Sequence, residues 1–447
     1  MSSRPRTDLL LSITLVISAL AIGGWMVWRS LERPDSGGGD DPGVVRTIDA
    51  AGDSLDQISP PENPPTLAPN LSTAALDALA DQLALPHARP NEALLTFGDP
   101  AALAKFLSRA SEAGLEVTGP FDGALTLRIG FRSFADLRNL LAAQEGESPG
   151  LSANFHVGIP DLKTPPPAGG TGTAPFESGL LQSLGIEAGT DRSTWGAGVT
   201  VAVIDSGISP HPAFREGQIT HLDLTSGEDA FNTHGTAMAS LVAGSAPGAE
   251  GLAPGADLLD LRIAGKDGLS DSFLLAQGIH TAMDRGADVI NISMATYGDA
   301  RPIAEAIAEA IRRGITVVAA VGNDAAGTKA WPAAYPGVIS VSGVAADGSL
   351  AYFSNSGRPT LSAPSVGVPS AYHDGSAALL AIGNGTSQAA ALVSGAAAAF
   401  RSRGLDVPTA LTRNARPGSG RKEEIGAGIL YLPALNTYRP VTKDRSR

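Results

Sequence analysis

The chain has 447 residues, of which 43% are hydrophobic, enough for two or three folded domains with a large core. Its 32 basic and 45 acidic residues give a net charge of −13, which argues against a nucleic-acid partner. The sequence contains no cysteine, so a thiol nucleophile, a disulfide framework and a cysteine-type zinc site are excluded.

An uncharged apolar segment lies close to the amino terminus. Residues 1–8 form a short tail, and residues 9–28 carry no charge and end in Trp25 and Trp28. At about 1.5 Å per residue, this segment matches the ~30 Å hydrocarbon core of a bilayer. We therefore expect a single-pass membrane anchor, with the carboxyl-terminal part outside the cytoplasm (periplasmic or extracellular). The alternative is a cleaved signal, because Ala19-Leu20-Ala21 has the small-x-small pattern of a cleavage site, and the protein would then be secreted.

A small module is expected between two linkers. Residues 29–90 are rich in proline and glycine, as is typical of a flexible tether, and residues 161–190 contain Pro165-Pro166-Pro167. Between them, residues 91–160 show hydrophobic patterns in the order β-α-β-β-α-β, typical of a split βαβ domain. The predicted elements are a strand at 92–97, a helix at 100–113, two strands within 115–131, a helix at 134–143 and a strand at 153–157.

Two apolar runs farther along predict buried parallel strands. Residues 199–204 are almost all β-branched and lead into Asp205, and residues 315–321 come just before Asn323. His234 and Ser387 instead open helical stretches of small residues, each entered through glycine and threonine. In an open α/β sheet, the carboxyl ends of strands and the amino ends of the following helices share one edge. These four residues are therefore expected to meet.

The four side chains make a complete set for nucleophilic catalysis. A serine hydroxyl is a weak nucleophile until an imidazole takes its proton, and the imidazole needs a carboxylate to set its tautomer. Ser387, His234 and Asp205 fit these roles. A position in the first helical turn gives Ser387 nearby backbone N–H groups, and the amide of Asn323 can complete an oxyanion hole.

These residues and their surroundings resemble the subtilases, the subtilisin-like serine peptidase family, whose triad runs in the order Asp, His, Ser. The resemblance covers about residues 190–435. The matching pieces are residues 198–208, 232–244, 253–256, 319–323, 335–339, 353–356 and 384–387. The resemblance implies a serine endopeptidase of protein or peptide substrates, with a parallel α/β sheet flanked by helices over residues 191–435 and a polar tail at 436–447.

The resemblance also assigns a role to the small module. Small domains of this layout precede the catalytic domain in many subtilases, where they act as intramolecular chaperones and inhibitors. Residues 91–160 would then be a propeptide that binds its own enzyme, with the processing site in the linker at 161–190. The alternative is a permanently attached accessory or partner-binding domain, because this fold has many functions.

The substrate cleft departs from the family pattern. The stretch usually written Ser-Leu-Gly is Ser293-Met294-Ala295 here. By resemblance, Ala320 and Trp331 complete the substrate-binding set. The methyl group of Ala295 lies where the substrate backbone would pair, so the cleavage specificity is left open.

No metal or cofactor is expected. The loop at 244–251 is short and offers Glu250 as its only carboxylate, whereas calcium takes six to eight oxygen ligands. A weaker site that uses Asp223 or Asp229 stays open. The six remaining histidines show no metal-binding spacing; they are His87, His156, His211, His221, His280 and His373.

Two other functions are compatible with the same motifs. The first is a catalytically idle subtilase-fold scaffold or binding module, suggested by the altered cleft and the weakly matched propeptide. An intact set of Asp205, His234, Asn323 and Ser387 argues against it, because an idle domain is free to lose any of them. The second is an esterase-like use of the triad, which a comparison of peptide and ester turnover would separate.

Overall fold

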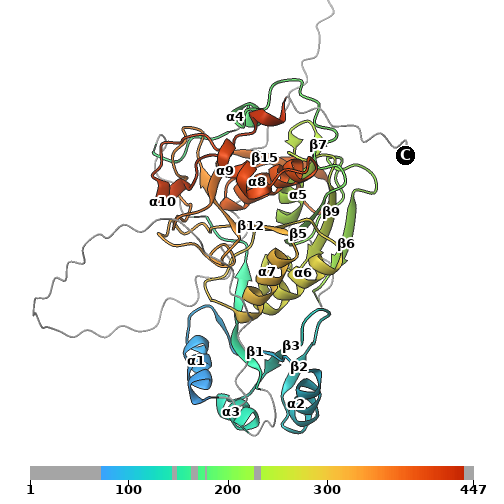
Figure 1. Cartoon of the computed structure of the whole chain (residues 1–447), viewed down its shortest axis with the longest axis vertical. Helices are drawn as coiled ribbons and strands as arrows, with labels where there is room; N and C mark the ends of the chain where they lie inside the picture. Colours follow the sequence, from blue (N-terminus) through green and yellow to red (C-terminus); the bar gives the residue numbers. More distant parts are fainter. Residues whose placement is uncertain (1–71, 143–147, 163–169, 177–178, 226–232, 437–447) are drawn as a thin grey trace, which may run out of the picture.

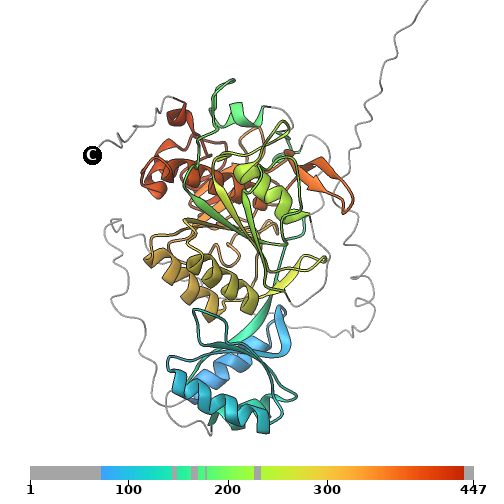
Figure 2. The same cartoon turned by 90° about the vertical axis from the view of Figure 1, so that its right-hand side faces the viewer.

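The computed structural model describes residues 72–142, 148–162, 170–176, 179–225 and 233–436. They form two parts, the N-terminal module (residues 72–160) and the large domain (residues 179–436). Figure 1 shows the module below the large domain, and Figure 2 shows the same arrangement from the side.

The N-terminal module is an antiparallel sheet covered on one face by helices. The strands lie in the order β4-β1-β3-β2, and α2 and α3 are on the face away from the large domain. Asp99 caps α2 by accepting hydrogen bonds from the N–H groups of Ala101 and Ala102. The elements are α1 (Thr73–Leu83), β1 (Ala88–Thr96), α2 (Pro100–Glu112), β2 (Glu116–Thr118), β3 (Thr126–Gly130), α3 (Phe134–Ala142) and β4 (Gly150–Gly158).

Helix α1 corrects the predicted linker. The sequence pattern placed residues 29–90 in a tether, but residues 73–83 are helical and β1 begins at Ala88. Leu76 and Leu79, three residues apart on one helix face, are buried. The tether prediction was therefore wrong for residues 73–90.

The predicted membrane anchor lies outside the described residues, together with the tail at 1–8 and the tether up to residue 71. Within the described part of the chain, no helix is long and apolar enough to cross a membrane.

The large domain is built on a seven-stranded parallel sheet in the order β14-β13-β12-β11-β5-β9-β6. Helices α5 and α8 pack on one face, and α6 and α7 cover the other (Figure 1). The inner strands are largely apolar and buried because helices cover both faces of the sheet, whereas the edge strand β6 is partly exposed. The seven strands are β5 (Thr200–Asp205), β6 (Ile219–Asp223), β9 (Asp257–Arg262), β11 (Val289–Ile292), β12 (Thr316–Ala320), β13 (Ile339–Val344) and β14 (Leu361–Pro364).

The helices on the two faces are α5 (His234–Ala243), α6 (Ser272–Asp284), α7 (Arg301–Arg312) and α8 (Thr386–Arg401).

Two short hairpins of the described residues lie outside the main sheet. They are formed by β7 (Ser245–Ala246) with β8 (Ala249–Glu250), and by β15 (Val368–His373) with β16 (Ala378–Gly383). The smaller helices are α4 (Leu180–Ser183), α9 (Val407–Asn414), α10 (Lys422–Ile425) and the 3-10 turn Pro433–Leu435.

The module contacts the large domain through a shared sheet and a shared core. Strand β10 (Leu269–Asp271) pairs antiparallel with β4 and becomes the fifth strand of the module's sheet. Asp271 accepts a hydrogen bond from Arg128 at 2.9 Å, and the rings of Phe121 and Phe273 meet edge to face at 5.1 Å. The hydrophobic core around α6 and α7 continues without a break into the module.

Candidate active site

Asp205 and His234 form a hydrogen-bonded pair at the edge of the sheet. Asp205 is the last residue of β5 and is fully buried, and His234 is the first residue of α5. The Nδ1 atom of His234 lies 2.9 and 3.0 Å from the two carboxylate oxygens of Asp205. Because a carboxylate only accepts, Nδ1 carries the proton and Nε2 becomes the basic nitrogen.

Ser387 lies in the first turn of α8 and is almost completely buried. The chain reaches it through Gly385, whose φ of 145° is a conformation that a residue with a side chain rarely adopts. The Oγ atom of Ser387 donates a hydrogen bond of 3.0 Å to the carbonyl oxygen of Ser293, just beyond β11. Because Ser387 is at the start of α8, it also lies next to the positive end of the helix dipole.

The side-chain amide of Asn323 has a fixed orientation beside Ser387. Its Oδ1 atom accepts hydrogen bonds of 2.9 Å from both the N–H and the hydroxyl of Thr386. These two donors leave Nδ2 as the end that faces the cleft, where it donates to the carbonyl oxygen of Pro160 at 3.1 Å. Thr386, which sets this orientation, was not among the residues selected from the sequence.

The predicted substrate-binding residues lie at or below this cleft. Ala295 pairs by main-chain hydrogen bonds with Gly158, and Trp331 pairs with Thr296, the next residue along. The Trp331 ring packs against Tyr335 in a tilted arrangement, with 4.4 Å between the ring centroids. Met294 and Ala320 are fully buried and belong to the hydrophobic cores on opposite faces of the sheet.

A segment of the N-terminal module occupies the cleft as an extended peptide. Gly158 donates to the carbonyl of Ala295 at 3.0 Å and accepts from its N–H at 2.9 Å. On the other side, the N–H of Ile159 donates to the carbonyl of Gly268 at 3.2 Å. Residues 158–160, which we call the seated segment, therefore lie between two backbone strands in the manner of an added β-strand. No pattern in the sequence indicated this placement.

Comparison with known proteins assigns the family. The profile of the subtilase family matches residues 196–421. The chain belongs to the subtilase family.

Individual relatives agree with this assignment. The subtilase is 33% identical to Subtilisin Savinase of Lederbergia lenta over 57% of its own chain and 94% of that protein. It is 30% identical to the Minor extracellular protease Epr of Bacillus subtilis, over 59% of its chain but only 42% of Epr. It therefore spans less than half of that relative. The fold is similar to that of fervidolysin from Fervidobacterium pennivorans, described as a keratinolytic enzyme related to subtilisin, with a TM-score of 0.64 at 22% identity over 80% of this chain and 62% of that one.

A second buried carboxylate supports the loop that follows Asp205. Asp260, on the neighbouring strand β9, is fully buried and accepts a hydrogen bond of 2.9 Å from the N–H of Ile208. Its Oδ2 atom lies 2.6 Å from Nδ1 of His221, and this hydrogen bond raises the pKa of that imidazole. Burial raises the pKa of Asp260 itself. Asp260 was not selected from the sequence, although an acidic residue inside the apolar strand β9 could have indicated it.

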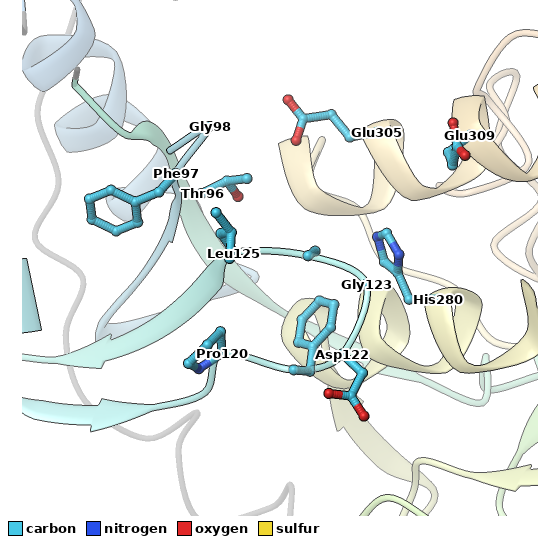
Figure 3. A pocket seen from close by; sticks show the side chains of 12 residues that line it. Thr96, Phe97, Gly98, Pro120, Asp122, Gly123, Leu125, His280, Glu305 and Glu309 are labelled. Atoms are coloured by element: carbon cyan, nitrogen blue, oxygen red, sulfur yellow. The ribbon is translucent and has the colours of Figure 1, made fainter. Parts of the chain in front are cut away.

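A cavity lies between the module and helices α6 and α7 of the subtilase (Figure 3). Its walls include Phe121 and Gly123 from the module, and His280 from α6. The Nδ1 atom of His280 is buried and has no hydrogen-bond partner among the described residues. Burial lowers the pKa of this imidazole, because desolvation disfavours its charged form.

The described residues contain no group of three acidic or histidine side chains that could hold a metal ion. The loop at 244–251 forms the β7–β8 hairpin, and its carboxylate, Glu250, accepts a hydrogen bond of 3.0 Å from the N–H of Gly248. Asp229 lies outside the described residues. The absence of a metal requirement stays a prediction.

Proposed function

We propose that this subtilase is a serine endopeptidase with Ser387 as nucleophile, His234 as general base and Asp205 as the carboxylate that orients the imidazole. The main support is the Asp205–His234 hydrogen bond, together with an Asn323 amide held in place next to Ser387. Its protease relatives agree with this chemistry.

The proposed reaction runs in two halves. Ser387 Oγ attacks the carbonyl carbon of the substrate while its proton passes to Nε2 of His234, and the tetrahedral oxyanion accepts hydrogen bonds from Asn323 Nδ2 and from backbone N–H groups at the start of α8. His234 then gives the proton to the leaving amine as the C–N bond breaks. Water attacks the acyl-enzyme in the same way, releasing the new carboxyl terminus and restoring the Ser387 hydroxyl.

The substrate is an extended peptide segment within a protein or peptide. The seated segment supports this, because Gly158 and Ile159 bind the cleft through main-chain hydrogen bonds to Ala295 and Gly268. Such bonds are available to most sequences that can become extended. A binding mode of this kind favours unfolded or mobile regions of proteins over compact ones.

The subtilase is made as a zymogen whose N-terminal module is the inhibitory propeptide. The carbonyl of Pro160 accepts from Asn323, as the carbonyl of a scissile bond would. We therefore assign self-cleavage to the Pro160–Asp161 bond, at the amino-terminal end of the predicted processing linker. A permanently attached accessory domain is less favoured, since it would keep the cleft occupied.

Labelling with a fluorophosphonate probe tests the catalytic assignment. After processing, the wild-type protein should be labelled and should begin at Asp161 by amino-terminal sequencing. Ser387→Ala should remain full length and unlabelled, with activity reduced by at least about 10⁴-fold. Labelling of Ser387→Ala would refute the assignment of the nucleophile. A wild-type protein that stays full length and shows neither labelling nor hydrolysis would favour the idle scaffold.

The proposal includes membrane attachment through residues 9–28, with the large domain outside the cytoplasm. Its support is the length and apolar character of this sequence segment. The protein should fractionate with membranes and be accessible to added protease in spheroplasts. Recovery in the soluble fraction with a new terminus at Ile22 would instead indicate a cleaved signal.

A further inference from the structure

Pro160 lies at a position where the antiparallel pairing calls for a backbone donor. Gly158 and Ala295 exchange two hydrogen bonds, and such pairs recur at every second residue of an antiparallel ladder. The next hydrogen-bonded pair is therefore residue 160 opposite Ser293. Any other amino acid at 160 would offer an N–H to the carbonyl of Ser293, but proline has none.

The carbonyl oxygen of Ser293 instead accepts a hydrogen bond from the hydroxyl of the nucleophile, Ser387. Ser387 Oγ lies 3.0 Å from this oxygen, and because a carbonyl can only accept, the hydroxyl is the donor. A hydroxyl has a single proton, so the proton that His234 must remove is directed toward Ser293. The seated segment thus binds like a substrate while the nucleophile is held in an unproductive hydrogen bond.

The rest of the seated segment and the strand that leads to it are firmly bound. Val157 is fully buried, and β4 pairs with β10 over three residues that include Gly158. The carbonyl of Pro160 also has its donor, Asn323 Nδ2, at 3.1 Å. Binding is therefore substrate-like at each of these contacts, and the one missing main-chain donor is at the residue whose carbonyl carbon would be attacked.

We propose that Pro160 makes the seated segment a slowly cleaved inhibitor of its own enzyme, because this residue lacks the N–H that would pair with the Ser293 carbonyl. The inference rests on the proposed peptidase function and adds its regulation. A residue with an N–H adds a hydrogen bond to the Ser293 carbonyl and so positions the scissile bond beside Ser387. Proline cannot form this hydrogen bond.

The first experiment compares self-cleavage of full-length wild type and Pro160→Ala after refolding. The time course of the form that begins at Asp161 is followed by gel and amino-terminal sequencing. Pro160→Ala should convert about five- to tenfold faster, the factor that one net hydrogen bond gives. Asp161→Ala, which changes the exposed neighbour and keeps Pro160, should stay within about twofold of wild type. An equal or slower rate for Pro160→Ala would overturn the proposal, a slower one indicating a preference for proline.

The second experiment separates the missing N–H from the shape of the proline ring, and does not depend on folding of a variant. Peptides that span residues 153–165, with proline, alanine or N-methylalanine at position 160, are offered to processed wild-type enzyme. The alanine peptide should have a kcat about five- to tenfold above the other two. Equal rates for N-methylalanine and alanine would overturn the role of the N–H. If the enzyme is labelled by a fluorophosphonate and cleaves all three peptides equally, this inference fails and the proposed function stands, whereas an unlabelled enzyme that cleaves none refutes both.

Discussion

The N-terminal module contacts the large domain at two places that differ in their chemistry. At the cleft, main-chain hydrogen bonds of 2.9 to 3.2 Å hold Gly158 and Ile159, and the side-chain amide of Asn323 donates to the carbonyl of Pro160 at 3.1 Å. On the faces of α6 and α7, the contact depends on side chains such as Phe121, and it borders an open pocket beside a buried nitrogen of His280 that has no partner among the described residues (Figure 3). In the proposed zymogen, we therefore expect the cleft contact to inhibit with little dependence on side-chain protonation, and the helix-face contact to respond to packing and pH.

The largest expected effect concerns the cleft contact. Asn323→Ala should lower the kcat of the processed enzyme about 10²–10³-fold, since it removes an oxyanion donor. The same substitution removes the hydrogen bond to Pro160, so the module should also bind less tightly. The matched variant Thr386→Val keeps the amide but loses one of the two donors that orient it, and should cost about tenfold. A kcat for Asn323→Ala within twofold of wild type would place the oxyanion hole elsewhere.

The helix-face contact can be weakened on its own. Phe121→Ala removes a ring that is 7% exposed and lies against Phe273, so it should lower the free energy of unfolding by about 3 kcal/mol. The measurement is denaturant unfolding in a Ser387→Ala background, which prevents cleavage. Processed enzyme obtained from the Phe121→Ala protein should hydrolyse substrate as wild type does, because the substituted module has by then been removed. A loss below about 0.5 kcal/mol would mean that the ring contributes little to this contact.

The pH dependence of stability should distinguish two imidazoles. Burial lowers the folded-state pKa of His280, so the unfolded chain binds a proton that the folded chain resists. Its contribution to stability is present above the unfolded pKa of about 6.5 and is lost as pH falls toward the folded pKa. His156, in β4, has its pKa lowered by burial as well and adds a change of the same sign.

His221 should show the opposite sign. Its hydrogen bond to Asp260 raises its folded-state pKa, so its contribution is fully present below about pH 6.5 and is lost as pH rises through the folded value. Melting temperatures between pH 5 and 8, in the Ser387→Ala background, test both predictions. His280→Gln should reduce the loss on the acid side, and His221→Gln should reduce the loss on the alkaline side. An unchanged acid-side loss in His280→Gln would show that the helix-face contact is not the pH-sensitive one.

The smallest expected effect is that of chelation, which should act on neither contact. EDTA should leave activity and melting temperature nearly unchanged, because a bound ion stabilises the folded state only where a site exists. Glu250 already accepts a hydrogen bond within its own hairpin. A fall of more than about 5 °C in melting temperature, reversed by calcium, would contradict this and point to a site elsewhere.

The local sequence determined the parallel strands before Asp205 and Asn323, the helices that begin near His234 and Ser387, and the β-α-β-β-α-β order of the module. Runs of β-branched residues, helix caps and turn pairs act within a few residues, so they can be recognised without knowledge of the fold. The chemistry expected of the four side chains followed from their position at strand and helix ends. Helix α1 was missed because the proline-rich residues before it dominated the composition of that stretch.

Tertiary structure alone decided the features on which the proposed inhibition and the predicted pH response rest. Pro160 meets Asn323 across 163 positions of sequence, Asp260 reaches the loop after Asp205 from a neighbouring strand, and His280 lines the pocket between α6 and the module. Each of these depends on the register between strands and on the packing of two folded parts. Register and packing arise from many long-range contacts acting together, and no short stretch of sequence contains that information.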